Sequence, residues 1–214
     1  MADPIKISEL RKDYKFKALL ESDVLTDPIE QFKVWFDEAM QAQLPEPNAM
    51  CLSTIQHNQP SSRYVLLKGI EHQGFVFFSN YNSNKGSEME AIPNVALNFI
   101  WLELERQVRV EGTVSKLTDA ENDDYFYSRP IGSQIGAIVS AQSSVLKDRK
   151  ELDDAWTAIE GKYHTEKPIR PEHWGGYLVK PNKIEFWQGR SSRLHDRLLF
   201  TLNEGKWELC RLSP

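Results

Sequence analysis

The chain of 214 residues is long enough for one domain with a sizeable core, and its 40% hydrophobic and 27% charged residues are ordinary for a globular protein. The net charge of −5 argues against nucleic acid or an anionic membrane as partner, so any anion site must be local. Cys51 and Cys210 form no CxxC, which indicates buried small side chains and no metal site. Without an apolar leader or long apolar stretch, a cytoplasmic protein is expected.

The N-terminal part begins with a polar segment, residues 1–25, which we expect to be loosely ordered. Asp27 and Pro28 then suit a helix start, as N-cap and first-turn proline. Apolar residues recur at helical spacing as far as Met40. The sequence therefore predicts an amphipathic helix that ends before Pro45 and packs its aromatic stripe in the core.

From residue 49 the apolar period changes to that of β-strands. Five strands are predicted, at residues 49–56, 62–68, 75–79, 95–102 and 106–117. Their short links favour an antiparallel barrel. Helices are predicted next, behind a Thr118–Glu121 capping box and at residues 133–139 and 148–163.

Strands return at the C-terminus. They are predicted at residues 174–180, 184–188, 193–202 and 207–212, with turns at Pro181-Asn182 and Asn203-Glu204-Gly205. The pattern as a whole indicates one α+β domain over residues 1–214, built on an antiparallel barrel with flanking helices.

The stretch EFWQGRSSRLHDR carries the densest chemistry. If a strand begins at Arg193, then Arg193, His195 and Arg197 share one face of it. Such a face favours an anion, and Trp187 just upstream offers a flat apolar wall for a planar ligand. The alternative is a solvated edge strand blunted by charge.

Two further stretches carry donors suited to phosphate. The loop Asn80–Gly86 exposes backbone N–H groups, includes Lys85 and runs into a helix N-terminus. Tyr125 and Arg129 lie four apart on a helix and Ser133 begins the next one, which suits a phosphate monoester. Each stretch also has a plain structural interpretation. The first can be an ordinary loop, and the second can be a helix C-terminus whose arginine complements the helix dipole.

Other polar residues are less specific. Arg63 and Lys68 have opposite parity on one strand, and each alone is typical of a surface charge. Gln107 points inward from a barrel wall, either as a structural amide or to contact the polar edge of a heterocycle. Gln142 and Ser143 lie in a polar loop whose side chains could also donate to a phosphate, or which could simply connect two helices.

Taken together and in order, these stretches resemble the pyridoxine/pyridoxamine 5′-phosphate oxidase family over nearly the whole chain. The matching motifs include RYVLLKG, FFSNYNS, ERQVRVEG, YFYSRP, WGGY and RLHDR. The resemblance implies an FMN-binding split barrel that works as a homodimer with active sites at the subunit interface. It implies oxidation of pyridoxine or pyridoxamine 5′-phosphate to pyridoxal 5′-phosphate, with oxygen as acceptor and hydrogen peroxide as product.

The resemblance also implies a set of site residues. Implied FMN contacts are Arg63, Tyr64, Val65, Leu66, Leu67, Lys68, Phe78, Ser79, Lys85, Gln107, Gln142, Ser143, Trp187 and Arg197. Implied substrate contacts are Lys68, Tyr125, Arg129, Ser133, Arg193 and His195, the last two being catalytic. Two alternatives stay open: a related flavin oxidase acting on another substrate, and a non-catalytic binder of flavin or pyridoxal phosphate.

One position departs from the family pattern. Where the family usually has Ser-Arg-Lys in the flavin-phosphate loop, this chain has Ser83-Asn84-Lys85. Asn84 lacks the bidentate clamp of an arginine, and a lysine cannot replace that geometry. We therefore expect the change to lower FMN affinity and to leave the fold intact.

Overall fold

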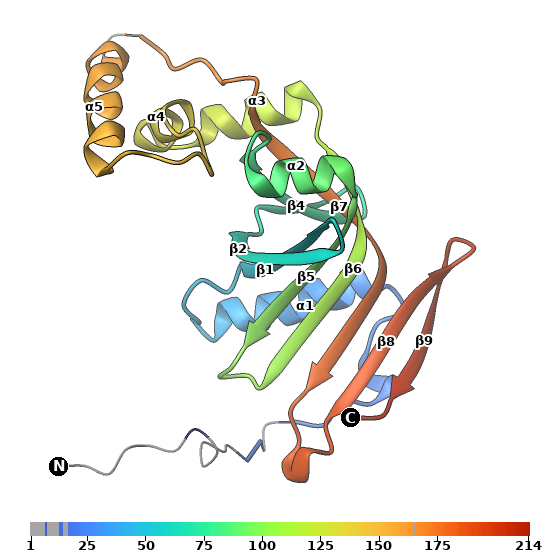
Figure 1. Cartoon of the computed structure of the whole chain (residues 1–214). Helices are drawn as coiled ribbons and strands as arrows, with labels where there is room; N and C mark the ends of the chain where they lie inside the picture. Colours follow the sequence, from blue (N-terminus) through green and yellow to red (C-terminus); the bar gives the residue numbers. More distant parts are fainter. Residues whose placement is uncertain (1–6, 8–12, 15–16, 165) are drawn as a thin grey trace, which may run out of the picture. The chain divides into compact units, whose positions relative to one another are not determined.

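The computed structural model describes residues 7, 13–14, 17–164 and 166–214 (Figure 1). The chain divides into two compact units. Unit 1 comprises Met1–Pro47, Asn98–Val110 and Asn182–Pro214, and unit 2 comprises Asn48–Leu97 and Glu111–Pro181. The prediction of a single domain over residues 1–214 stays a prediction. Among the described residues, no helix has the length and apolar character needed to cross a membrane.

Unit 2 is built on an antiparallel sheet. It holds β1 (Ala49–Gln56), β2 (Gln59–Leu66), β3 (Gly69–Glu71) and β4 (Gly74–Asn80), with parts of β5 (Asn94–Trp101), β6 (Arg106–Lys116) and β7 (Trp174–Gln188). The strand order is β2-β1-β5-β6-β7-β4-β3. The turn of the β1–β2 hairpin places His57 and Asn58 at positive φ, the geometry of a two-residue hairpin loop that matches strand twist.

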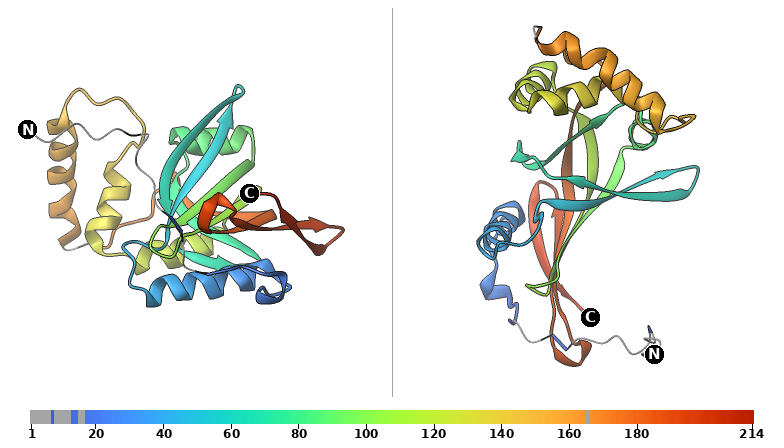
Figure 2. Two further views of the ribbon diagram at one scale, coloured as in Figure 1. Left: turned by 90° about the horizontal axis from the view of Figure 1, so that it is seen from below. Right: turned by 90° about the vertical axis from the view of Figure 1, so that its left-hand side faces the viewer.

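Four α-helices complete unit 2. They are α2 (Asn84–Ala91), α3 (Asp119–Ser128), α4 (Ile131–Val139) and α5 (Arg149–Glu160), and a short 3₁₀ turn, Gly161–His164, follows α5. The predicted capping box opens α3, with Thr118 and Glu121 bonding reciprocally. Helices α4 and α5 pack side by side (Figure 2), with the Trp156 ring near Gly132 and Gly136.

Helix α2 begins at Asn84, inside the stretch 80–86 that was predicted as a loop. The hydroxyl of Ser83 caps it by accepting from the Gly86 N–H, at 3.3 Å. A Cβ at Gly86 would lie 2.0 Å from the carbonyl oxygen of Tyr81, so only glycine fits there. The N–H groups of this first turn are therefore held close to the end of β4.

Unit 1 packs one helix against strand ends. Helix α1 (Pro28–Gln41) begins at the predicted cap, where Asp27 accepts from the N–H groups of Ile29 and Glu30. Phe32 packs against Phe99 with ring centroids 4.8 Å apart. The unit also contains β8 (Asp196–Asn203) and β9 (Lys206–Leu212), which form a hairpin through the predicted turn.

Only part of the N-terminal segment is described. Residues 1–6, 8–12 and 15–16, most of the stretch expected to be loosely ordered, lie outside the described residues. Leu19, which is described, is buried, and its N–H donates to the Asp196 carboxylate at 3.0 Å. A short 3₁₀ helix, Glu21–Asp23, follows it.

Three local predictions were wrong. The turn expected at Pro181-Asn182 is continuous strand, because β7 pairs with β4 up to Val179 and with β8 from Lys183 onward. A proline without an N–H is tolerated where a strand changes partners. The short strand β3 was predicted as a loop, and Cys210, expected to be buried, is exposed on β9.

The strand expected to begin at Arg193 begins at Asp196. Residues Ser191–Arg193 form a 3₁₀ turn in which Ser192 and Arg193 have φ of 56° and 62°. Arg193 and His195 therefore precede the strand, and their predicted alternation with Arg197 on one strand face was wrong. Neither residue pairs with β7, and the loop is shaped by hydrogen bonds of its own side chains.

Candidate functional site

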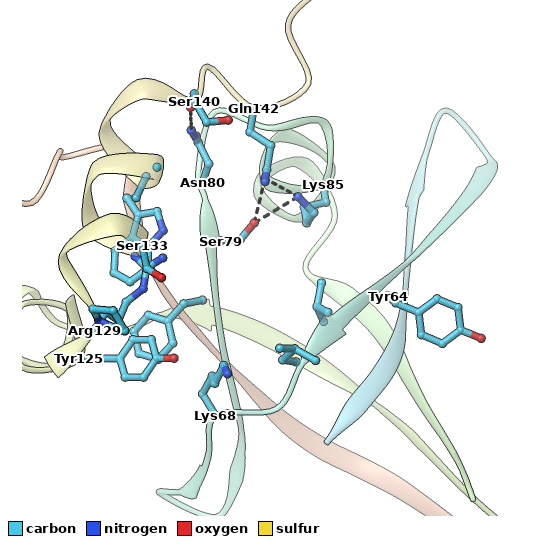
Figure 3. A pocket seen from close by; sticks show the side chains of 17 residues that line it. Tyr64, Lys68, Ser79, Asn80, Lys85, Tyr125, Arg129, Ser133, Ser140 and Gln142 are labelled. Atoms are coloured by element: carbon cyan, nitrogen blue, oxygen red, sulfur yellow. Dashed lines mark hydrogen bonds between the residues drawn. The ribbon is translucent and has the colours of Figure 1, made fainter. Parts of the chain in front are cut away.

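Unit 2 contains a cavity of about 680 Å³ that brings together most of the predicted site residues (Figure 3). The predicted residues that line it are Tyr64, Val65, Leu66, Lys68, Phe78, Ser79, Lys85, Tyr125, Arg129, Ser133 and Gln142. They come from β2, β4, α2, α3, α4 and the loops beside them. The side chain of Tyr64 is exposed and points away from the labelled polar groups.

One end of the cavity is organised around Lys85. Its Nζ donates to Gln142 Oε1 at 2.7 Å and to the hydroxyls of Ser79 and Ser83 at 3.2 Å each. Burial lowers the pKa of Lys85, the cation of Arg63 lowers it further, and Glu88 opposes both. A lysine at the first turn of α2, beside two hydroxyls, suits the phosphate of a bound ligand.

The loop after α4 is fastened to this end. The Asn80 side-chain amide donates to the Ser140 carbonyl at 3.2 Å, and the Asn84 N–H donates to the Ser143 hydroxyl at 3.2 Å. Ser143 has a φ of 73° and does not itself line the cavity. The loop after α4 and the start of α2 are thus joined by hydrogen bonds and present their polar groups together.

The other end of the cavity is an aromatic stack with a cation beside it. The Tyr125 ring stacks on Phe78 at a centroid distance of 3.8 Å, and the Arg129 guanidinium lies 4.5 Å from the centre of the Trp174 ring. Burial lowers the pKa of Arg129 and raises that of Tyr125, while each residue opposes the shift of the other. Within the described part of the chain, Arg129 Nη1 is buried and has no hydrogen-bond partner.

That orphaned donor is informative, because buried polar atoms normally have partners. Arg129 is placed by its own backbone, whose carbonyl accepts from the Gln134 side chain at 2.8 Å. Ser133 and Lys68 line the same cavity. The Arg129 cation, the hydroxyls of Tyr125 and Ser133 and the start of α4 therefore suit a phosphate monoester, as the Lys85 end also does.

Besides Ser143, two predicted contacts of unit 2, Arg63 and Leu67, do not line the cavity. Arg63 donates to Ser61 Oγ and Glu88 Oε2 at 2.8 Å each and also to Thr54. Burial raises the pKa of Glu88, but the bonds from Thr54 and Arg63 outweigh burial, so the net pKa is lowered. Leu67 is buried in the core. Their roles in binding stay predictions.

Unit 1 carries the remaining predicted residues. Gln107 and Trp187 line a second cavity, of about 330 Å³. Arg197 pairs in register with Trp187 and binds Glu185 through Nε at 2.7 Å and Nη2 at 3.2 Å. The His195 ring lies 4.6 Å from that of Trp187. Arg193 is exposed in the preceding turn.

Some lining residues were missed from the sequence. They are Asn80, Pro130, Gly136, Ala137, Ser140 and Trp174. Trp174 lies in the motif WGGY, but no spacing ties it to Arg129, since strand pairing brings it there. Asn80 begins the predicted phosphate loop and was named only as its boundary.

Comparisons with known proteins show the family of this chain. Residues 36–163 match the family model described as pyridoxamine 5′-phosphate oxidase, and residues 174–214 match the pyridoxine 5′-phosphate oxidase C-terminal dimerisation region. Curated relatives named pyridoxine/pyridoxamine 5′-phosphate oxidase include one from Acaryochloris marina, 54% identical over 100% of this chain and 99% of its own, and one from Trichormus variabilis, 55% identical over 97% and 98%.

Among solved structures, PhzG from Burkholderia lata 383, in complex with tetrahydrophenazine-1-carboxylic acid, is similar with a TM-score of 0.86. It is 28% identical and the match covers 92% of this chain and 98% of that one. A pyridoxamine 5′-phosphate oxidase-related, FMN-binding protein from Nostoc punctiforme, 16% identical, has a TM-score of 0.67 over 86% and 97%. The predicted α+β fold class with an antiparallel split barrel is confirmed. The chain belongs to the pyridoxamine 5′-phosphate oxidase family.

Proposed function

We infer that this protein is an FMN-dependent oxidase that converts pyridoxine or pyridoxamine 5′-phosphate to pyridoxal 5′-phosphate. Relatives that carry the oxidase name are 53–55% identical over nearly the whole chain. The observation that carries the proposal is the Arg129 guanidinium, whose buried Nη1 has no partner in the described part of the chain. A substrate phosphate would satisfy that donor.

The residues at the Lys85 end suit the phosphate of FMN. Lys85, the hydroxyl of Ser79 and the Gln142 amide would hold it together with N–H groups at the start of α2. The redox chemistry is supplied by FMN, through which two electrons pass from the substrate to oxygen with formation of hydrogen peroxide. The protein's part is to bind and to orient the two partners, while water enters to release ammonia when the amine is the substrate.

The substrate would be held mainly by its phosphate. Tyr125, Arg129, Ser133 and Lys68 line the same cavity and would surround the substrate phosphate. Binding energy from this remote group orients the ring for reaction, so it contributes to turnover as well as to affinity. Arg193 and His195 would act electrostatically on the ring, stabilising charge that develops on its phenolic oxygen.

We propose that two chains form each active site. The dimerisation-region match covers residues 174–214, which include Trp187, Arg193, His195 and Arg197. In this proposal these residues of one chain complete the unit 2 cavity of its partner. A homodimer would then contain two sites related by its two-fold axis. A cytoplasmic location stays a prediction.

The reaction is tested by peroxide formation from pyridoxamine 5′-phosphate and from unphosphorylated pyridoxamine, with FMN added. Turnover of the phosphorylated compound alone is expected. If neither compound yields peroxide while FMN stays bound, the protein is a flavin binder and the oxidase proposal fails. If an unphosphorylated aromatic compound reacts better, the alternative of a related flavin oxidase acting on another substrate is favoured.

Shared sites are tested by mixing Arg129→Ala and Arg197→Ala chains, each nearly inactive as a homodimer. After dissociation and random reassociation, half of the dimers are mixed and each has one intact site, so about a quarter of wild-type activity should return. If both residues act within one chain, mixing restores nothing.

A further inference from the structure

The loop between β7 and β8 is held closed by Arg190, which lies near its start and binds two residues at its end. The main-chain N–H of Arg190 donates to His195 Nδ1 at 3.1 Å. The guanidinium of the same residue donates from Nη1 to Asp196 Oδ2 at 2.9 Å. Arg190 thus contacts the last residue of the loop and the first residue of β8.

The conformation of this loop needs such a restraint. Ser192 and Arg193 both have positive φ, at 56° and 62°, a region that side chains other than glycine rarely adopt. Leu194 donates to the Ser191 carbonyl at 3.1 Å, which closes only the middle of the loop. The two bonds of Arg190 join the start of the loop to its end, and they fix the position from which the His195 side chain extends.

Asp196 anchors the closed loop to the rest of unit 1. Its carboxylate also accepts from the Leu19 N–H at 3.0 Å and from Arg211 Nη1 at 2.8 Å. Arg211 in turn binds the Glu21 carboxylate. The partner of the Arg190 guanidinium is therefore itself fixed by the N-terminal segment and by β9.

The contact with His195 also determines a protonation state. A main-chain N–H can only donate, so Nδ1 accepts and the proton of the neutral ring lies on Nε2. The ring packs against Trp187, with centroids 4.6 Å apart, and against Tyr14, at 5.7 Å. Burial lowers the pKa of His195, the Arg193 cation lowers it further, and Asp196 opposes both.

We propose that Arg190 is a positioning residue, which fixes the orientation and the tautomer of His195 by closing the Arg190–His195 loop onto Asp196. The inference rests on the proposed function only for the role of His195 in the reaction. The geometry itself requires no ligand. The proposal predicts that Arg190 acts on the reaction through the imidazole and makes no contact of its own with substrate.

The test is nitrogen NMR of the imidazoles in ¹⁵N-labelled, FMN-loaded protein, with the His195 signals assigned by their loss in His195→Gln. Wild type should show a single Nε2–H tautomer that protonates below the ordinary pKa. In Arg190→Ala both tautomers should be populated, protonation should occur at higher pH, and turnover at pH 7 should fall roughly tenfold, because small misplacements of a catalytic group are costly. Arg190→Lys, which keeps the charge, should recover part of each effect.

Arg149→Ala is the matched control, since Arg149 forms an exposed ion pair with Asp153 on α5. An unchanged His195 tautomer and titration in Arg190→Ala would overturn the proposal. Should Arg190→Ala fail to fold, Arg190→Lys and Arg190→Gln carry the same decision, because wild-type spectra in both would also overturn it. If the wild-type protein shows no oxidase activity, the proposed function fails, whereas the ring spectra still decide the role of Arg190.

Discussion

The main-chain N–H of Asn84 donates to the hydroxyl of Ser143, with nitrogen and oxygen 3.2 Å apart. Asn84 is the first residue of α2 and Ser143 follows α4, so this bond joins the two segments that surround Lys85. It depends on the backbone of Asn84 and leaves the side chain of this exposed residue available for substitution. If the loop before Lys85 holds the FMN phosphate as proposed, position 84 is a place where flavin affinity should change without disturbing the cavity wall.

Asn84→Arg should tighten FMN binding roughly tenfold, because a charge-assisted hydrogen bond contributes about 1.5–3 kcal/mol. The gain should shrink at high salt, while turnover at saturating flavin should change little. A flavin-fluorescence titration of the apoprotein at two ionic strengths measures both. Ser87→Arg, which adds the same charge at an exposed site further along α2, is the control. Equal gains in both variants would mean that position 84 does not face the phosphate.

Arg129→Gln should raise the KM for the phosphorylated substrate tenfold or more, since it removes a charge-assisted partner on the order of 1.5–3 kcal/mol. FMN should remain bound, because Arg129 belongs to the other end of the cavity. Steady-state kinetics with a parallel flavin titration test this. Arg149→Gln is the control, since Arg149 forms an exposed ion pair with Asp153 on α5 and should leave the kinetics unchanged. A loss of FMN in Arg129→Gln would reverse the assignment of the two ends.

Glu88→Gln should destabilise the fold by about 1–3 kcal/mol at pH 7, because it weakens a buried partner of Arg63 and Thr54. The pKa of Glu88 lies below its ordinary value of 4.5, so its ionised form stabilises the fold above pH 4.5. That contribution is lost as the pH falls through the lower, folded-state pKa. The difference between wild type and variant should therefore be largest above pH 4.5 and shrink below it.

Urea unfolding of the apoprotein at a series of pH values measures this difference. Glu90→Gln, on the exposed side of the same helix, is the control and should show no such convergence. A constant difference from pH 7 to pH 3 would mean that the Glu88 charge does not stabilise the fold.

Arg193→Ala should lower turnover by about 10²–10³ with flavin retained, the usual effect of removing a charge that acts in the transition state. Arg197→Ala should instead lose FMN, since Arg197 is held rigidly by Glu185 beside Trp187. Flavin content after gel filtration and kcat at saturating FMN separate the two outcomes. The opposite pattern would show that the roles of these two arginines are exchanged.

Local signals in the sequence predicted those parts of the fold that local interactions determine. The cap at Asp27 and the box at Thr118 lie where side chains bond their own helix, and both helices begin as expected. Pro181 led to the wrong prediction of a turn, because proline is usual in turns but here lies where β7 changes pairing partners. The positive φ of Ser192 could not be foreseen, since no glycine marks it.

The candidate site divides in the same way. Tyr125, Arg129 and Ser133 could be grouped from helical spacing, because one helix end and the next helix start position all three. Trp174 could not be added to them, because β7 reaches the cavity only through pairing with β4. The ion pair that directs Arg63 toward Glu88 depends on α2 and β2 meeting in space, which no spacing in the sequence encodes.

Helix α4 carries Ser133 in its first turn, and Ser140 and Gln142 follow directly after its end. Its nine residues span about 13 Å, and in the proposed binding mode this length sets the separation of the two phosphate groups. Inserting one residue would rotate everything beyond it by about 100° and lengthen the helix by about 1.5 Å. Ser133 and the Ser140–Gln142 segment could then no longer both face the cavity, so under the proposed binding mode the length of this helix would limit which pairs of phosphorylated ligands fit together.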